Sequence, residues 1–191
     1  MTDTRSRWEG RYATAHGIDA APSRFLLEHA ALIHGRVLDV AAGRGRNTLF
    51  LARRGITVDA IDISFAALRT LHATAVTEHL RVQAVQADLE SFPLPRNRYD
   101  ALINVRYLQR SLFHGLREAV KPGGIILFET FLIDQRLIGH PSNPEYLLER
   151  GELRAAFTDW EIVHYAEGLL EEPRQRAYLA RLVARRPSKR D

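Results

Sequence analysis

The sequence contains no cysteine among its 191 residues, and it has only one methionine and two tryptophans. The absence of cysteine excludes a disulfide framework, a thiolate nucleophile and cysteine-ligated zinc. Eight histidines are present, but they are scattered and do not follow the spacing of a metal-binding motif. We therefore expect no metal site.

Long hydrophobic runs are also missing. No apolar stretch approaches the roughly 20 residues that a membrane-spanning helix requires, and residues 1–12 lack the apolar core of a secretory signal. We expect a cytoplasmic protein that has no membrane partner. The formal net charge is +4, and much of the excess lies in residues 181–191. Such a tail can bind nucleic acid, but a solvated, frayed terminus is the simpler interpretation.

Short apolar runs alternate with amphipathic stretches of ten or more residues, which is the pattern of βαβ units. The runs at 37–40, 101–105 and 125–129 are nearly continuous, as expected of parallel strands buried on both faces. The prediction is one α/β domain over residues 1–191, with a doubly wound, mostly parallel seven-stranded sheet and an antiparallel closing strand. We predict strands at 37–40, 57–61, 81–86, 99–105 and 124–130, a closing hairpin of 160–165 and 177–184, and helices at 23–34, 47–54, 65–76, 109–120 and 149–157.

A glycine-containing turn separates the first predicted strand from the helix that follows. Gly43 and Gly45 allow positive φ and let a ligand approach the backbone closely, at the edge where open α/β sheets bind ligands. Thr48 stands where a dinucleotide fingerprint has a third glycine or alanine, which argues against an NAD-dependent oxidoreductase. Asp39 would repel a pyrophosphate but suit a cationic sulfonium ligand with an ammonium group. Alternatively, its carboxylate fixes the turn by accepting backbone N–H groups.

Two more aspartates follow the next predicted strands. Asp62 comes about 20 residues after the glycines, where an acidic side chain can accept hydrogen bonds from both hydroxyls of a ribose. Because Ser64 follows, Asp62 is alternatively a turn or capping residue. Asp88 could accept a hydrogen bond from an adenine amino group, with Ile63 or Leu89 against the ring face. The alternative for Asp88 is an ordinary helix N-cap.

Five segments resemble the successive motifs of class I S-adenosylmethionine-dependent methyltransferases: VLDVAAGRGRN, AIDIS, QADLESFPL, YDALINV and LREAVKPGGIILFETF. They cover about residues 36–131 in the right order and spacing. The phrases DVAAGRGRNTLFLARRG and WEGRY most closely resemble the small tellurite-resistance-type methyltransferases. The resemblance implies a Rossmann-like methyltransferase fold, S-adenosyl-L-methionine as the cofactor, and in-line methyl transfer to a small-molecule acceptor.

The same resemblance implies which residues hold the cofactor. The glycine turn would contact the methionine end, the carboxylate after the second strand the ribose, and the segment after the third strand the adenine. The end of the fourth strand would face the sulfonium, and residues 1–35 would form a helical lid segment. The expected cofactor-binding residues are Asp39, Ala41, Gly43, Gly45, Asn47, Asp62, Ile63, Asp88, Leu89, Asn104, Val105 and Tyr12.

The acceptor side is expected to come from the loops after the fourth and fifth strands. Residues 131–148 form a substrate-side loop, since their prolines and Asn143 favour an ordered loop. Arg106 and His140 together would suit an anionic acceptor, and histidine titrates near neutrality, although a surface role for His140 is the simpler interpretation. We expect Tyr107, His140 and Arg106 to be catalytic. The full set of candidate groups is Arg106, Tyr107, Glu129, Thr130 and His140.

Two alternative functions stay open. Residues 104–107 match the ends of the Asn/Asp-Pro-Pro-aromatic loop of amino-group methyltransferases but lack both prolines, so we treat the match as coincidental. A nucleic-acid (RNA) methyltransferase would explain the basic charge, but no separate recognition domain or aromatic-basic stripe is present, so nucleic acid is not an expected partner. The other alternative is a non-catalytic S-adenosylmethionine-binding module whose acceptor pocket is filled by residues 131–148.

Overall fold

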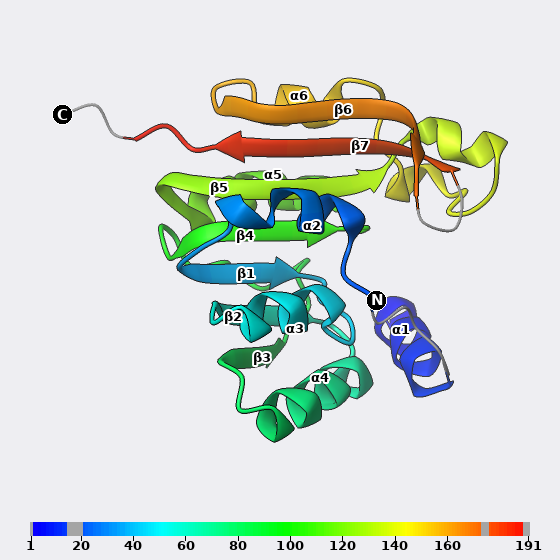
Figure 1. Ribbon diagram of the computed structural model, residues 1–191. Coiled ribbons are helices and arrows are strands. Elements are labelled where there is room, and N and C mark those ends of the chain that lie inside the picture. Colours follow the sequence, from blue (N-terminus) through cyan, green and yellow to red (C-terminus); the bar gives the residue numbers. More distant parts are fainter. Residues whose placement is uncertain (1, 15–20, 173–175, 189–191) are drawn as a thin grey trace.

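The computed structural model describes residues 2–14, 21–172 and 176–188. Its strands are β1 (Arg36–Val40), β2 (Thr57–Asp62), β3 (Val82–Gln86), β4 (Tyr99–Val105), β5 (Val120–Phe131), β6 (Glu161–Glu171) and β7 (Arg176–Arg185). They form one seven-stranded sheet in the order β3-β2-β1-β4-β5-β7-β6 (Figure 1). The first five strands are parallel, and β7 lies antiparallel between β5 and β6. The predicted α/β class, mostly parallel sheet and antiparallel closing strand are confirmed.

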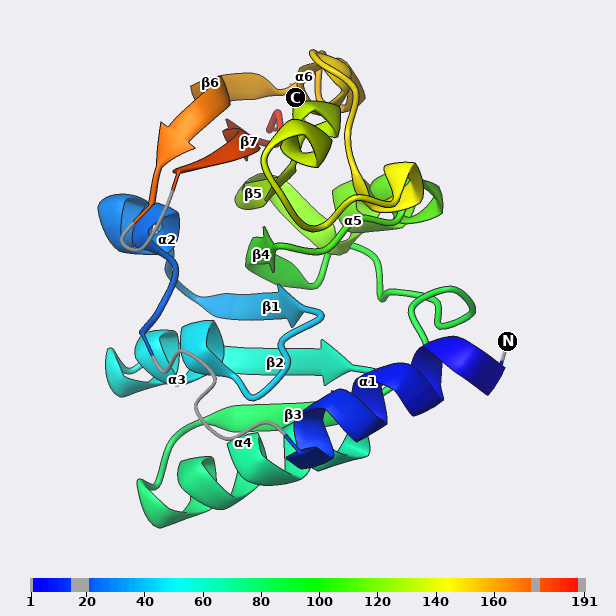
Figure 2. The ribbon, with the colours of Figure 1, turned by 90° about the vertical axis from the view of Figure 1, so that its right-hand side faces the viewer.

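Helices lie on both faces of this sheet. They are α1 (Thr2–Thr14), α2 (Arg24–His29), α3 (Arg46–Arg53), α4 (Phe65–Thr77), α5 (Phe113–Ala119) and α6 (Glu152–Ala156). Figure 2 shows α2 and α3 on one face and α5 on the other, while α1 lies across the edge at which the parallel strands end. None of the helices in the described ranges is long and apolar enough to cross a lipid bilayer.

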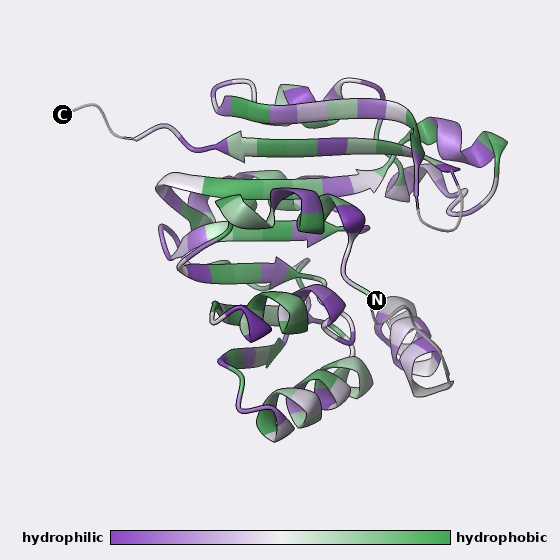
Figure 3. Cartoon of the chain, viewed as in Figure 1, coloured by the Kyte–Doolittle hydropathy of each residue, from purple (hydrophilic) through white to green (hydrophobic). Residues whose placement is uncertain are grey.

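The strands supply apolar side chains to both faces, because successive residues of a strand point in opposite directions. One buried cluster contains Leu102 of β4 and Phe128 of β5 together with residues of α5 and α6. The second contains Ile103 and Leu127 from the same strands, packed against α2 and α3. Figure 3 shows this apolar character along the central strands and the mostly polar character of α1. The near-continuous apolar runs therefore reflect strands covered by helices on both sides.

Three predicted helices are shorter in the structure. Where one helix was predicted over residues 23–34, the chain forms α2 followed by a 3₁₀ turn, η1 (Ala30–Leu32). The prediction over 109–120 becomes a 3₁₀ turn, η2 (Arg110–Leu112), followed by α5, because Gln109 has an extended backbone. The prediction over 149–157 becomes α6, since Gly151 precedes it with a left-handed φ of 77°.

Strand β5 begins at Val120, earlier than the strand predicted at 124–130, and runs through residues 121–124. Val120 pairs with Tyr99, and the next pair is Ile125 with Ala101, so residues 121–124 form a bulge in β5. The closing hairpin is longer than predicted, because β6 and β7 remain paired from Glu161↔Arg185 to Glu171↔Arg176. Residues 1 and 15–20 of the predicted lid segment and residues 189–191 lie outside the described residues.

Candidate active site

Two cavities open at the carboxyl ends of the parallel strands. The smaller cavity, of about 600 Å³, lies beside the turn between β1 and α3 and reaches the ends of β2 and β3. The larger cavity, of about 1320 Å³, lies over the ends of β4 and β5 and is bounded by the segment 131–148. The residues that line both cavities, and so mark their join, are Trp8, Arg11, Arg46, Glu90, Arg106 and Tyr107.

The turn between β1 and α3 contains three residues with positive φ: Ala41 at 53°, Gly43 at 56° and Gly45 at 79°. A Cβ on Gly43 would lie 2.6 Å from the hydroxyl oxygen of Tyr12, so only glycine admits this tyrosine. A Cβ on Gly45 would lie 2.3 Å from Leu71 of α4. Ala41, Gly43 and Tyr12 line the smaller cavity, whereas Gly45 does not. Gly45 therefore serves helix packing, and its expected contact with a ligand stays a prediction.

Asp39 is a buried carboxyl group in the wall of the smaller cavity. Its Oδ2 accepts a hydrogen bond from Thr48 Oγ1 at 2.5 Å. Burial raises the pKa of Asp39 to about 7, although the Thr48 hydrogen bond and the nearby charge of Arg46 act in the opposite direction. A cation in this cavity would favour the ionised carboxylate, because an opposite charge offsets the cost of burial.

Asp62 lines the same cavity at the end of β2. Its Oδ2 accepts the backbone N–H of Gly43 at 2.7 Å, and its Oδ1 accepts that of Ser64 at 2.8 Å. Burial raises the pKa of Asp62, while these backbone hydrogen bonds lower it. The carboxylate thus holds the glycine turn and the start of α4 together, as the turn interpretation predicted, and its ligand role stays a prediction.

The side chains expected beside an adenine ring come together at the far end of the smaller cavity. Ile63, Asp88 and Leu89 all line it. Asp88 Oδ1 accepts the backbone N–H of Glu90 at 3.0 Å within a turn, and no helix begins there. The N-cap alternative for Asp88 is therefore wrong.

Asn104 and Asn47 each tie together two segments of chain around the site. Asn104 is 1 % exposed, donates from Nδ2 to the carbonyl oxygen of Tyr107 at 2.8 Å, and does not line either cavity. It holds the loop after β4, so that Val105 faces the smaller cavity instead. Asn47 lines that cavity and is 5 % exposed. Its Oδ1 accepts the N–H of Ser23 at 2.9 Å, which ties α3 to the start of α2.

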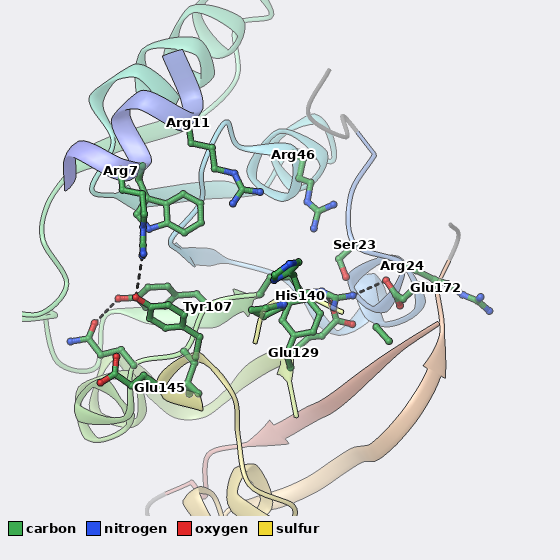
Figure 4. A pocket seen from close by; sticks show the side chains of 18 of the residues that line it. Arg7, Arg11, Ser23, Arg24, Arg46, Tyr107, Glu129, His140, Glu145 and Glu172 are labelled. Atoms are coloured by element: carbon green, nitrogen blue, oxygen red, sulfur yellow. Dashed lines mark hydrogen bonds and ion pairs between the residues drawn. The ribbon is translucent and has the colours of Figure 1, made fainter. Parts of the chain in front are cut away.

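Helix α1 is attached on both sides of the join. On one side, Glu9 accepts the N–H of Ala66 at 3.0 Å and the hydroxyl of Ser64 at 2.8 Å, at the first turn of α4. On the other, Arg7 donates to the hydroxyl of Tyr146 at 3.1 Å, and its guanidinium lies 5.6 Å from the centre of that ring. The helix therefore connects α4 to the segment 131–148 (Figure 4).

The larger cavity has a closed ring of two arginines and two glutamates in its wall, which we call the charge ring. Arg106 contacts Glu129 at 3.0 Å and Glu172 at 2.8 Å, and Arg181 contacts Glu129 at 2.6 Å and also Glu172. Glu129 is 1 % exposed. Arg106 is thus matched by two carboxylates. The structure pairs Arg106 with carboxylates, and its expected role with His140 toward an anionic acceptor stays a prediction.

The remaining acceptor-side candidates have separate places. Tyr107 lines both cavities and donates from its hydroxyl to Gln109 Oε1 at 2.5 Å. Burial raises the pKa of Tyr107, and the carboxylates of Glu90 and Asp88 raise it further, so it stays a neutral phenol at neutral pH. His140 is exposed and lines the larger cavity. Thr130 is buried and lines neither cavity.

Several cavity residues escaped the sequence reasoning. Trp8, Arg11 and Arg46 line the join, and Glu172 completes the charge ring. Trp8 and Arg11 belong to the WEGRY segment that carried part of the resemblance, and Arg46 follows Gly45 directly. No local pattern marks Glu172, because one partner, Arg106, is distant in the chain and the other, Arg181, lies on the next strand.

Comparison with known proteins agrees with this geometry. Residues 37–124 match the family described as a methyltransferase domain. Ubiquinone biosynthesis O-methyltransferases of Salmonella arizonae and Salmonella typhimurium are each 30% identical over 135 residues, covering 65% of this chain and 56% of theirs. The chain thus spans about half the length of these curated relatives.

Solved structures share the fold. TehB from Haemophilus influenzae has a TM-score of 0.76 at 21% identity, over 94% of this chain and 67% of that one. A structure described as the conversion of a disulfide bond into a thioacetal group during echinomycin biosynthesis has a TM-score of 0.75 at 22% identity, over 100% of this chain and 92% of that one.

Proposed function

We propose that this chain is a class I S-adenosylmethionine-dependent methyltransferase. It binds S-adenosylmethionine in the smaller cavity and methylates a small molecule in the larger cavity, as the matched methyltransferase domain supports. The observation that carries the proposal is the join, where Tyr107 and Arg106 line both cavities. Bound there, S-adenosylmethionine supplies a methyl group activated by a positively charged sulfur.

The side chains of the smaller cavity fit this cofactor. Asp39 and Asp62 are buried carboxyl groups that suit the ammonium and sulfonium charges and the ribose hydroxyls. Gly43 leaves the backbone open beside Tyr12. The proposed cofactor-binding residues are Tyr12, Asp39, Ala41, Gly43, Asn47, Asp62, Ile63, Asp88, Leu89 and Val105, with Gly45 and Asn104 supporting them.

The protein promotes methyl transfer by position. Holding two reactants in alignment at contact distance removes much of the entropic barrier, and this requires rigid walls. Tyr107 is fixed through its hydroxyl and its carbonyl oxygen, and Arg106 by the charge ring. We propose that α1, within the lid segment 1–35, and the substrate-side loop 131–148 exclude water, and that residues 1–191 act as one methyltransferase domain.

Two observations support a small-molecule acceptor over the alternatives. The segment 131–148 bounds a cavity of about 1320 Å³ rather than filling it, which argues against a plugged, non-catalytic module. Two basic residues near the C-terminal end of the described chain are engaged within the fold: Arg185 contacts Glu161 at 3.4 Å, and Arg186 donates to the carbonyl oxygen of Val120 at 2.5 Å. This leaves less free positive charge for nucleic acid.

The test is thermal unfolding with S-adenosylmethionine, S-adenosylhomocysteine, NAD or no ligand. A ligand at 100 times its Kd adds about 2.7 kcal/mol, which raises the midpoint by roughly 5 °C or more at this size. We expect this shift with the two adenosyl ligands and its loss in Asp62→Asn. Asp100→Asn, at the opposite edge of the sheet beside Lys121, should keep it. A shift with NAD alone, or none with a folded protein, would contradict the proposal.

Turnover is then measured as formation of S-adenosylhomocysteine from S-adenosylmethionine with phenols, thiols, amines and selenite as acceptors. Turnover of a phenol, thiol, amine or oxyanion supports the small-molecule assignment. Turnover with RNA alone would favour the nucleic-acid alternative.

A further inference from the structure

Two arginines at the join of the cavities have no ion-pair partner in the part of the chain that the structure describes. Arg11 of α1 and Arg46, the first residue of α3, line both cavities. Neither makes a hydrogen bond or an ion pair with another residue in the described ranges, although Arg46 lies near enough to Asp39 to lower its pKa. Figure 4 shows the two side chains directed into the same open space. Two like charges in one space favour an anion between them.

Three other arginines of the larger cavity are matched by carboxylates, and Arg7 donates to the Tyr146 hydroxyl. Arg24 pairs with Glu28 at 2.8 Å, Arg110 pairs with Glu152 at 2.6 Å, and Arg106 belongs to the charge ring. The join also contains an acidic residue, Glu90, and its carboxylate raises the pKa of Tyr107. The unmatched positive charge therefore lies at Arg11 and Arg46.

Aromatic side chains line the larger cavity from four segments. Trp8 comes from α1, Tyr107 from the loop after β4, Phe131 from the end of β5, and Tyr146 from the segment 131–148. Their faces already attract guanidinium groups, with Arg11 at 5.1 Å from the Trp8 ring and Arg106 at 4.5 Å from the Phe131 ring. Walls of this kind favour flat, conjugated ligands, which stack on aromatic rings.

We propose that the methyl acceptor is a planar aromatic molecule with a carboxylate-type anionic group, and that Arg11 and Arg46 bind this group at the join. The inference rests on the proposed function and adds the substrate class. The sequence analysis assigned the contact with an anionic acceptor to Arg106. The structure favours Arg11 and Arg46 for this contact, because Arg106 is already paired with carboxylates. The methionine carboxylate of the cofactor carries the same chemistry, so the experiment separates the two sources.

The experiment is calorimetric titration of the protein saturated with S-adenosylhomocysteine. The probes are 2-naphthoate and its neutral counterpart 2-naphthamide, and benzoate with cyclohexanecarboxylate. We expect 2-naphthoate to bind at least about tenfold more tightly than 2-naphthamide, because charge-assisted hydrogen bonds to arginine are strong. The preference should fall to about twofold in Arg11→Gln and Arg46→Gln, and it should weaken in high salt. Arg24→Gln, which alters a paired arginine of the same cavity, should retain it.

The affinity for S-adenosylhomocysteine is measured first in each variant. If Arg11→Gln and Arg46→Gln weaken that affinity tenfold but keep the preference for 2-naphthoate, the arginines bind the cofactor carboxylate and the inference is overturned. Equal binding of 2-naphthoate and 2-naphthamide, or of benzoate and cyclohexanecarboxylate, also overturns it. A folded protein that binds no S-adenosylhomocysteine contradicts the proposed function itself, which is a separate outcome.

Discussion

The smaller cavity takes most of its walls from short stretches of chain that follow β1, β2 and β3 in turn, at residues 39–49, 62–63 and 87–90. The larger cavity is assembled from places as distant as Arg7 and Ala177, with contributions from α1, β4, β5 and the segment 131–148. In the first, a carboxylate such as Asp62 is held by backbone N–H groups. In the larger cavity, side chains are positioned by ion pairs with other side chains, as in the charge ring. One cavity is therefore a local product of strand ends, and the other depends on long-range packing.

The largest expected effect is on the charge ring. Glu129→Gln leaves Arg106 and Arg181 with only Glu172 between them, and breaking a buried ion pair costs about 3 kcal/mol. The melting temperature should fall by roughly 10 °C, while the affinity for S-adenosylhomocysteine stays within about twofold. Glu161→Gln removes an exposed partner of Arg185 on the same sheet and should cost about 0.5 kcal/mol or less. Equal losses in the two variants would contradict a buried ring.

The second effect concerns the smaller cavity alone. Asp62→Asn cannot accept both N–H groups, so either Gly43 or Ser64 is left with an unpaired buried donor. Such a loss costs about 2 kcal/mol, and we expect the affinity for S-adenosylhomocysteine to fall about thirtyfold by calorimetry. Asp100→Asn serves as the matched control. A normal affinity in Asp62→Asn would show that the glycine turn needs no support from this carboxylate.

The third effect is a pH dependence. Since burial raises the pKa of Asp39 to about 7, the native protein holds a proton that the unfolded chain releases, and this contribution to stability is lost as pH rises from about 4 to 7. A cationic ligand favours the ionised carboxylate. The affinity for S-adenosylmethionine should therefore rise about tenfold from pH 6 to pH 8, with proton release in calorimetry. The affinity of Asp39→Asn should not depend on pH in this way. If that variant shows the same pH dependence as the parent protein, a group other than Asp39 is responsible for it.

The smallest effect tests the contact between α1 and the segment 131–148. Tyr146→Phe removes the hydrogen bond from Arg7 but keeps the ring, so the KM for an acceptor should rise by about twofold. Tyr146→Leu also removes the cation–π contact and should raise KM further. Affinity for S-adenosylhomocysteine should be unchanged in both. A larger change in cofactor affinity than in acceptor KM would contradict the proposal that the acceptor, and not the cofactor, occupies the larger cavity.

The sequence could predict the smaller cavity because parallel strands end at one edge. Asp39, Gly43 and Asp62 follow neighbouring strands, and the structure places all three beside that cavity. Gly45 and Asn104 stand at the same strand ends but line neither cavity, since spacing along the chain does not define where a residue faces after a tight turn. Arg106 shows the same limit, because a positive charge in a sequence does not reveal its partners.

The sequence by itself therefore determined the sheet, the edge at which the two cavities open, and the carboxylates of the smaller cavity. These follow from hydrophobic periodicity and from the short turns that connect each strand to the next element. Only the tertiary structure decided that Arg106 is neutralised by Glu129 and Glu172, and that Arg11 and Arg46 keep their charge at the join. The reason is that the energy of a charge depends on distances in space, and these residues come from elements that are separated along the chain.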